Sequence, residues 1–279
     1  MTKKDLHNKT LGFTLIELSI VLVVIGLIVG GIFVGADMLN AAQVRATVGQ
    51  EEKYQSAIKT FQTKYKDLPG DISAVKATQF GLFSEAAGLG FTVGHEDQNG
   101  LIEGGSAGAT IALGETIDFW EHLYAGGLID SAMGIIGNSQ IVVATGALSG
   151  LVTKISQTLP PTKTTPPNYF TVYAASGLNY LQIVPVSQIP VSGVYTFGTV
   201  GLTPVQAFSM DIKLDDGNPL TGIVQADAIT GVLNALPSTN AAPTNNTCVL
   251  GTGVSTDTYN RTAGLGASDG SCSLEFRFN

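Results

Sequence analysis

The chain has 279 residues and a formal net charge of -8, and 13% of its residues are charged. Its length accommodates one domain of about 200 residues behind a membrane helix. The excess of acidic side chains argues against nucleic acid as the main partner, because binding to a phosphate backbone needs a basic surface. After about residue 70, the abundance of Gly, Ser, Thr, Asn and Pro favours short strands and loops.

A basic segment at the N-terminus precedes a long apolar one. Residues 1–12 contain three lysines and one aspartate, and residues 18–36 contain no charged side chain. An apolar run of this length crosses a hydrocarbon core of about 30 Å, and its positive flank is expected to stay cytoplasmic. The run ends at Asp37 without an Ala-x-Ala-like site, so an ordinary secretory signal peptide fits poorly.

One carboxylate, Glu17, lies at the start of this apolar segment. An ionisable group at membrane depth costs about 3 kcal/mol or more, so it predicts a functional contact with a specific partner. The residues alone also allow a plain signal anchor, in which Glu17 lies near the headgroups and the lysines.

The helical pattern continues beyond the membrane segment. We expect one helix from Phe13 to about Lys66, about 80 Å long, with an apolar first half and an amphipathic second half. The segment Leu68-Pro69-Gly70-Asp71 should end it, because proline disfavours helix before it and glycine favours a turn. The stripe in the second half consists of Ala41, Val44, Val48, Tyr54, Ile58, Phe61 and Tyr65.

Two acidic segments contain candidate cation ligands. The first lies in a loop-like region, residues 81–114, and offers Asp97 and Asn99, but it lacks the ligand spacing of a calcium loop. The second offers Asp215 and Asp216 beside a glycine. Turn chemistry explains both segments more simply, so we expect no metal and no cofactor, with calcium as the alternative.

Two short helices are expected in the C-terminal region. Residues 114–130 should form one that ends at Gly126-Gly127, with His122 at the surface or at a cap. Thr203 should cap the other, with Pro204 first and Gln206 third in a helix that runs to about Leu214 and stops by Gly217. The expected buried side chains are Ile117, Trp120, Leu123 and Tyr124 in the first helix, and Val205, Phe208 and Ile212 in the second.

Strands are expected where β-branched and aromatic residues are enriched. A proline-rich linker, residues 159–167, should be extended. The expected strands are Gln140 to Ala144, Tyr169 to Ala174, Tyr180 to Val186, Ile223 to Ala228 and Ser273 to Phe278.

The chain has two cysteines, Cys248 and Cys272. In an exported protein such a pair favours one disulfide, which would close a loop worth about 3 kcal/mol in the chain-entropy model. The alternative is a pair of unbonded buried thiols.

The segment Gly12-Phe13-Thr14-Leu15-Ile16-Glu17 resembles the processing site of type IV prepilins and of the pseudopilins of type II secretion systems. The resemblance implies cleavage between Gly12 and Phe13 by a prepilin peptidase and N-methylation of Phe13. It also implies that Glu17 pairs with the N-terminal amine of a neighbouring subunit, since opposite charges attract strongly where the dielectric constant is low.

The same resemblance implies an α+β, pilin-like fold: a long helix packed against an antiparallel sheet. Its parts would be a leader (1–12), a transmembrane and assembly half-helix (13–36), an amphipathic half-helix (37–67) and a head (68–279). The implied partners are other pilin or pseudopilin subunits, the prepilin peptidase and the inner-membrane assembly platform. The protein would cross the inner membrane of a Gram-negative bacterium once, with a periplasmic head, before it enters a filament.

Two functions stay open at this point. The chain is either a structural subunit of a type IV pilus or secretion pseudopilus, or a minor tip subunit or adhesin whose head binds a surface, a secreted substrate or DNA. A head of this size is large for a repeating major subunit, whereas Glu17 favours lateral packing within a filament. Catalysis is not expected, because processing leaves only His95 and His122 as histidines and no catalytic motif is present.

Overall fold

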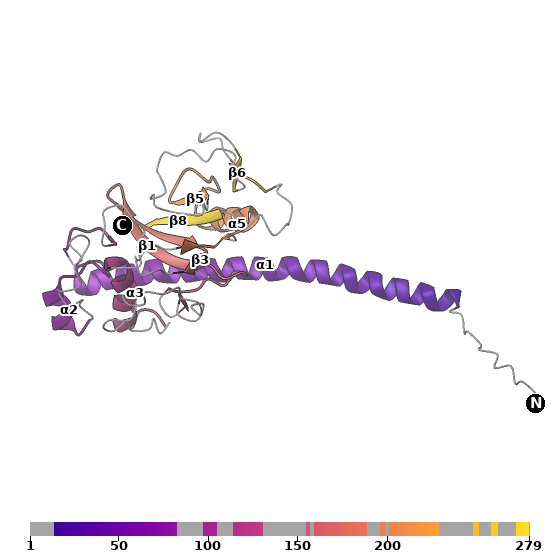
Figure 1. The fold of residues 1–279 in the computed structure, drawn as a ribbon, viewed down its shortest axis with the longest axis horizontal. Coiled ribbons are helices and arrows are strands. Elements are labelled where there is room, and N and C mark those ends of the chain that lie inside the picture. The colour runs from indigo at the N-terminus through magenta and orange to yellow at the C-terminus, as the bar shows by residue number, and fades with distance from the viewer. Residues whose placement is uncertain are drawn as a thin grey trace, which may run out of the picture. The chain divides into compact units, whose positions relative to one another are not determined.

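The structure is a computed structural model, and it describes residues 14–82, 97–104, 114–130, 155–156, 159–188, 196–198, 201–228, 248–250, 258–261 and 272–278. The chain divides into two compact units, residues 1–42 and residues 43–279. Figure 1 shows the fold. The expected α+β architecture, with a long N-terminal helix and an antiparallel sheet in the C-terminal part, is confirmed. The expected start of the helix at Phe13 lies just outside the described residues.

Helix α1 spans Leu15–Tyr65. Its large apolar side chains in the first unit are exposed on all faces, and their exposed fractions run from 44% for Val29 to 89% for Leu15. In the second unit only one stripe is buried, as the helical spacing predicts. Ala41 is exposed and was wrongly assigned to this stripe. The buried residues of α1 are Val44, Thr47, Val48, Glu51, Tyr54, Ala57, Ile58, Phe61 and Tyr65.

The main sheet has four antiparallel strands in the order β1-β2-β8-β5. Strands β1 (Tyr169–Ala175) and β2 (Leu178–Val184) form a hairpin. Its two turn residues, Ser176 and Gly177, both have positive φ angles, as a type I′ hairpin turn requires. Strand β8 (Cys272–Phe278) then lies between β2 and β5 (Val224–Ala228).

Most of the expected strands are confirmed. The segment expected from Tyr180 to Val186 is divided between β2 and the short strand β3 (Val186–Gln188), which pairs with β4 (Thr196–Phe197). A further pair joins β6 (Val249–Leu250) to β7 (Thr258–Tyr259). The strand expected over residues 140–144 lies outside the described residues.

Aromatic side chains pack the second half of α1 against the sheet and helix α3 (Glu115–Ala125). The Tyr54 ring lies edge-on to Trp120 at 5.2 Å and to Phe170 of β1 at 5.0 Å, measured between ring centroids. Phe119 of α3 reaches Phe278 of β8 at 6.0 Å. Aromatic burial of this kind is a major contribution to the stability of a core.

The buried face of α3 differs from the expected one. Trp120 and Leu123 are buried as predicted, but Tyr124 is 38% exposed and the side chain of Ile117 is not described. His122 is fully buried, so its expected position at the surface is wrong. Its Nδ1 accepts a hydrogen bond of 2.9 Å from the Gly70 N–H, a partner distant in sequence. Helix α3 ends at Gly126 and Gly127, as predicted.

The proline-rich segment folds back on itself and is not a simple extended linker. The Thr162 N–H donates to the Asn168 carbonyl at 2.8 Å, and the Phe170 N–H donates to the Pro160 carbonyl at 2.9 Å. The side chain of Gln50 on α1 donates to the Pro161 carbonyl at 3.1 Å. Polar groups of this segment therefore find partners within the fold, which composition alone does not indicate. The short helix α2 (Ala74–Phe80) follows α1 in the chain.

Helix α5 (Pro204–Leu214) has the predicted capping box between Thr203 and Gln206. Its buried face was predicted wrongly, since Val205 is 44% exposed and Ile212 is 54% exposed, and Phe208 is only partly buried. The buried side chains are Pro204, Gln206, Ala207, Met210 and Asp211. The helix reaches Leu214 as expected, but its C-cap residue is Asp215 and not Gly217. The predicted disulfide between Cys248 and Cys272 is confirmed, with a Cα–Cα distance of 5.1 Å.

Candidate functional sites

The start of α1 is closed by a capping box between Thr14 and Glu17. The Thr14 N–H donates to Glu17 Oε2 at 2.8 Å, and the Thr14 hydroxyl donates to the same oxygen at 2.7 Å. In return the Glu17 N–H donates to Thr14 Oγ1 at 3.3 Å. This arrangement satisfies backbone groups that the first helical turn leaves unpaired. The spacing Thr-x-x-Glu predicts such a cap, so the role of Thr14 could have been recognised from the sequence.

The first unit presents an apolar helix around Glu17. Helix α1 is long and apolar enough to cross a membrane, and its most apolar stretch is fully exposed. Gly26, Gly30, Gly31 and Gly35 face open space, where a Cβ atom would touch nothing within 4 Å. Small residues of this kind allow another helix to approach closely. The expected cleavage residues Gly12 and Phe13 lie outside the described residues.

A first acidic cluster brings together Asp71, Asp97 and Glu115. Each offers a carboxylate oxygen, and these three oxygens lie within 4.8 Å of one another. Asp71 is placed by its neighbour Gly70, whose φ of +91° suits glycine and whose backbone passes against α3. A Cβ atom at Gly70 would lie 2.4 Å from the Glu115 carbonyl oxygen. Sequence reasoning identified Asp97 but missed Asp71 and Glu115.

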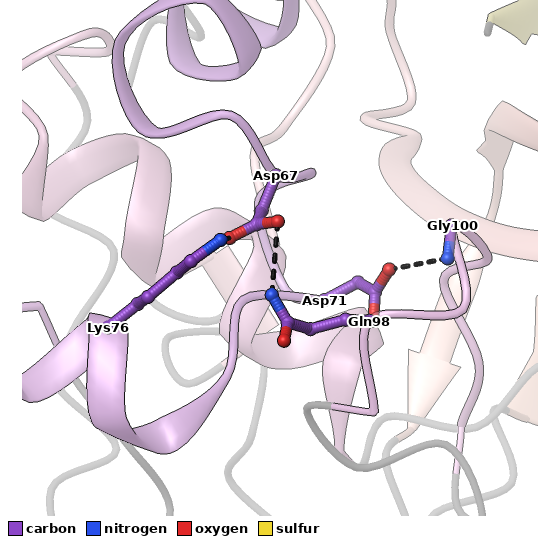
Figure 2. A network of polar contacts seen from close by, with 5 residues as sticks. All are labelled: Asp67, Asp71, Lys76, Gln98 and Gly100. Carbon is purple, nitrogen blue, oxygen red and sulfur yellow. Dashed lines mark hydrogen bonds and ion pairs between the residues drawn. The ribbon is translucent and has the colours of Figure 1, made fainter.

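Two carboxylates of this cluster are deeply buried. Asp71 is 2% exposed and Glu115 is fully buried. Asp71 Oδ2 accepts from the Gly100 N–H at 2.7 Å, as Figure 2 shows, and Glu115 Oε2 accepts from the Glu103 N–H at 2.9 Å. Their other oxygens, Asp71 Oδ1 and Glu115 Oε1, have no hydrogen-bond partner among the described residues.

Burial makes both carboxylates hard to ionise. It raises the pKa of Asp71 to about 6 and the pKa of Glu115 to about 8, although backbone N–H donors oppose the shifts. The negative charge of Asp97 raises both pKa values further. Negative charge on Asp71 and Glu115 is therefore unfavourable unless a proton or a cation offsets it.

Asn99, the other predicted ligand, holds the loop together. Its amide Nδ2 donates to Asp97 Oδ2 at 3.1 Å and to Glu103 Oε2 at 3.0 Å, while its Oδ1 accepts from the Leu101 N–H at 2.7 Å. All the polar atoms of this side chain are thus engaged within the loop. A neighbouring network, also in Figure 2, joins Asp67 to Lys76 and to Gln98.

A second acidic cluster consists of Asp211, Asp215 and Asp216, whose oxygens also lie within 4.8 Å of one another. Asp211 is fully buried. It accepts from the Tyr259 hydroxyl at 2.8 Å and from the Gly217 N–H at 3.2 Å. Asp216 accepts from the Asn218 N–H and the Thr221 hydroxyl, and Asp215 accepts from the N–H groups of Ile223 and Val224. The protein's own donors therefore occupy this cluster.

Comparison with known proteins identifies one segment. The family model described as the prokaryotic N-terminal methylation motif matches residues 7–33. This motif is the cleavage and methylation signal of type IV prepilins and pseudopilins, so the expected resemblance is confirmed for this part of the chain. No curated protein and no solved structure matches the chain. Together with the exposed apolar helix, the motif supports a membrane-anchored, pilin-like substrate of a prepilin peptidase.

Proposed function

We propose that this protein is a structural subunit of a type IV pilus or of a type II secretion pseudopilus. It is released from the inner membrane into the filament by an assembly platform, and its role is structural, without catalysis. The observation that carries the proposal is the methylation motif on residues 7–33 followed by an apolar helix that the rest of the chain leaves exposed.

The exposed apolar helix supports assembly because such a surface is unstable in water. A membrane covers it before assembly, and the helices of other subunits would cover it in a filament. The four glycines that face open space in the first unit fit close packing of this kind.

Glu17 is the proposed assembly contact. In the single chain its Oε2 accepts both donors of Thr14, and this leaves the carboxylate without a counter-charge among the described residues. Cleavage after Gly12 would create an amine on Phe13, one residue before the helix cap. The amine of a neighbouring subunit then offers the positive charge that makes Glu17 less costly to bury.

The test separates the charge of Glu17 from its capping role. A Glu17→Gln variant keeps an acceptor for Thr14 but loses the charge, whereas a Thr14→Ala variant loses the hydroxyl but keeps the charge. We expect both variants to lose residues 1–12, as measured by intact mass. We expect only Glu17→Gln to be missing from sheared filaments. Normal assembly of Glu17→Gln, or equal loss of both variants, would contradict the charge-pairing proposal.

A minor role in the filament is the second candidate, in which the head binds a surface, a secreted substrate or DNA. The size of the second unit, residues 43–279, favours it. Abundance separates the two roles, because a major subunit dominates sheared filaments and a minor subunit is scarce in them. Quantitative mass spectrometry of purified filaments measures this ratio, and a dominant share would exclude the minor role.

A further inference from the structure

We propose that Asp71, Asp97 and Glu115 form a binding site for a calcium ion in the head. The inference is independent of the filament function, because it rests on residues of the second unit alone. It differs from the sequence-based expectation, in which Asp97 and Asn99 were candidate ligands from one loop. The proposed ligands come from three segments: the turn after α1, the loop 97–104 and the first turn of α3.

The three carboxylates lie close enough together for a single ion to contact all of them. Ligand oxygens lie about 2.3–2.6 Å from Ca²⁺, so oxygens on opposite sides of the ion are about 5 Å apart. The three oxygens of this cluster lie within 4.8 Å of one another. Magnesium usually keeps several of its waters and binds one or two carboxylates, whereas calcium accepts flexible sets of six to eight oxygens, so three carboxylates from three segments favour calcium.

The unpaired oxygens point independently to a ligand at this site. Buried polar atoms in folded proteins almost always have a partner, and a buried atom without one calls for an explanation such as an ion. Asp71 Oδ1 and Glu115 Oε1 are such atoms, on side chains that are 2% exposed and fully buried. The remaining oxygens of these two residues are held by the N–H groups of Gly100 and Glu103, which orient both carboxylates.

No basic side chain forms an ion pair with this cluster within the described part of the chain. The two ion pairs there join Lys53 to Asp130 and Lys76 to Asp67. Two buried carboxylates and an exposed one that lie close together repel one another unless a cation or protons offset their charge. A divalent cation would offset this charge and would also give Asp71 Oδ1 and Glu115 Oε1 a partner.

The site is open to solvent on one side. Asp97 is exposed, and Asp71 lines a hollow in the surface together with Lys66, Asp67 and Gln98. This hollow gives an ion a path of entry and gives water room to complete the coordination shell, because Ca²⁺ takes six to eight oxygen ligands. A bound ion would cross-link the loop 97–104 to the end of α1 and to α3, and would stiffen this part of the head.

The experiment measures thermal unfolding of the full mature protein in detergent, after EGTA treatment and then with increasing CaCl₂. We expect Tm to rise by about 5 °C at 10 mM CaCl₂, with an apparent Kd of about 0.1–1 mM, the range of extracellular calcium modules. We expect the same concentration of MgCl₂ to have a much smaller effect.

Four variants locate the response. Asp97→Asn changes an exposed side chain, so folding is preserved, and Glu115→Gln replaces a buried carboxyl group by an amide of the same size. Both should weaken calcium binding at least about tenfold. Glu121→Gln, on the same helix, and Asp216→Asn, in the second acidic cluster, should bind calcium as the unmodified protein does.

Several results would overturn the proposal. These are an unmodified protein that does not respond to 10 mM CaCl₂, a response that survives in Asp97→Asn and Glu115→Gln, and a response that only Asp216→Asn abolishes. An equal response to MgCl₂ would overturn the assignment to calcium. In the first case, bound protons and not an ion would relieve the repulsion between the carboxylates.

Discussion

The two acidic clusters of the head each contain three carboxylates, but they differ in how the buried oxygens are hydrogen-bonded. Asp71, Asp97 and Glu115 leave two buried oxygens without partners, whereas Asp211, Asp215 and Asp216 each accept hydrogen bonds from the chain. Within each cluster, the three carboxylate oxygens lie within 4.8 Å of one another. Proximity of carboxylates alone therefore does not distinguish a candidate ion site from a turn. The buried oxygens do, because Asp71 Oδ1 and Glu115 Oε1 have no partner among the described residues, whereas both oxygens of Asp211 accept a hydrogen bond.

The two clusters also differ in the contacts that fix their carboxylates in position. The second cluster receives the Tyr259 hydroxyl from β7, which pairs with β6 directly after Cys248. The disulfide joins Cys248 to Cys272 at the start of β8. The first cluster has no such covalent support within the described residues, and its ligands are positioned by hydrogen bonds and by the close approach of Gly70 to α3.

Loss of the disulfide should have the largest effect and should act on one cluster only. We expect Cys248→Ala combined with Cys272→Ala to lower the free energy of unfolding by about 2–5 kcal/mol, since the cross-link restricts the unfolded chain. The calcium response should persist in the variant. Urea denaturation followed by fluorescence of Trp120, the only tryptophan, measures the loss. A variant that remains as stable as the unmodified protein, or that loses its calcium response, would contradict the separation of the clusters.

Removal of Asp211 should have an intermediate effect. In Asp211→Ala the buried Tyr259 hydroxyl and the Gly217 N–H lose their acceptor, and an unpaired buried donor costs about 1–3 kcal/mol. Asp216→Ala is the matched control in the same turn, and its exposed side chain should cost much less. Both are measured by urea denaturation in EGTA. An equal loss of unfolding free energy in the two variants would contradict a special contribution of the buried Asp211 hydrogen bonds to stability.

The pH dependence should give the smallest effect. Burial raises the pKa of Asp211 to about 6 from its ordinary value of 3.8, although hydrogen bonds from Tyr259 and Gly217 oppose the shift. The folded protein therefore holds this proton more tightly than the unfolded chain does. The resulting stability is fully present below about pH 4 and is lost as pH rises through 6.

The control for the pH dependence is the Asp211→Asn variant, because its amide does not titrate. Between pH 5 and pH 7 the unmodified protein should lose about 1 kcal/mol of unfolding free energy more than the variant. Urea denaturation in EGTA at several pH values measures the difference. The other raised carboxyl groups titrate in both proteins and cancel. Parallel pH profiles for the two proteins would contradict the raised pKa of Asp211.

Local features of the molecule could be predicted well from the sequence. The capping box of Thr203 and Gln206 needs only residues three apart, and its prediction is confirmed. The end of α3 at Gly126 and Gly127 is confirmed for the same reason. The disulfide prediction is confirmed because the chain offers a single possible pair. Thr14 could have been found by the same local rule, since it lies three residues before Glu17.

Features that depend on distant segments were missed. Asp71 appeared only as part of a helix-ending turn and Glu115 only as part of a short helix, because the segments that bring them to Asp97 are far apart in the sequence. His122 was assigned to the surface because its partner, the Gly70 N–H, lies 52 residues away. The pattern of apolar residues in α5 likewise did not reveal that Asp211 would be buried against Tyr259.

The sequence by itself determined the apolar N-terminal helix, its processing motif, the position of Glu17 and the pairing of the cysteines. These follow from residue type and short-range spacing, which act within a few turns of the chain. Only the tertiary structure decided which helix faces are buried and which carboxylates meet. Burial and charge repulsion depend on the segments that pack together, and that packing places Asp71, Asp97 and Glu115 around a common point.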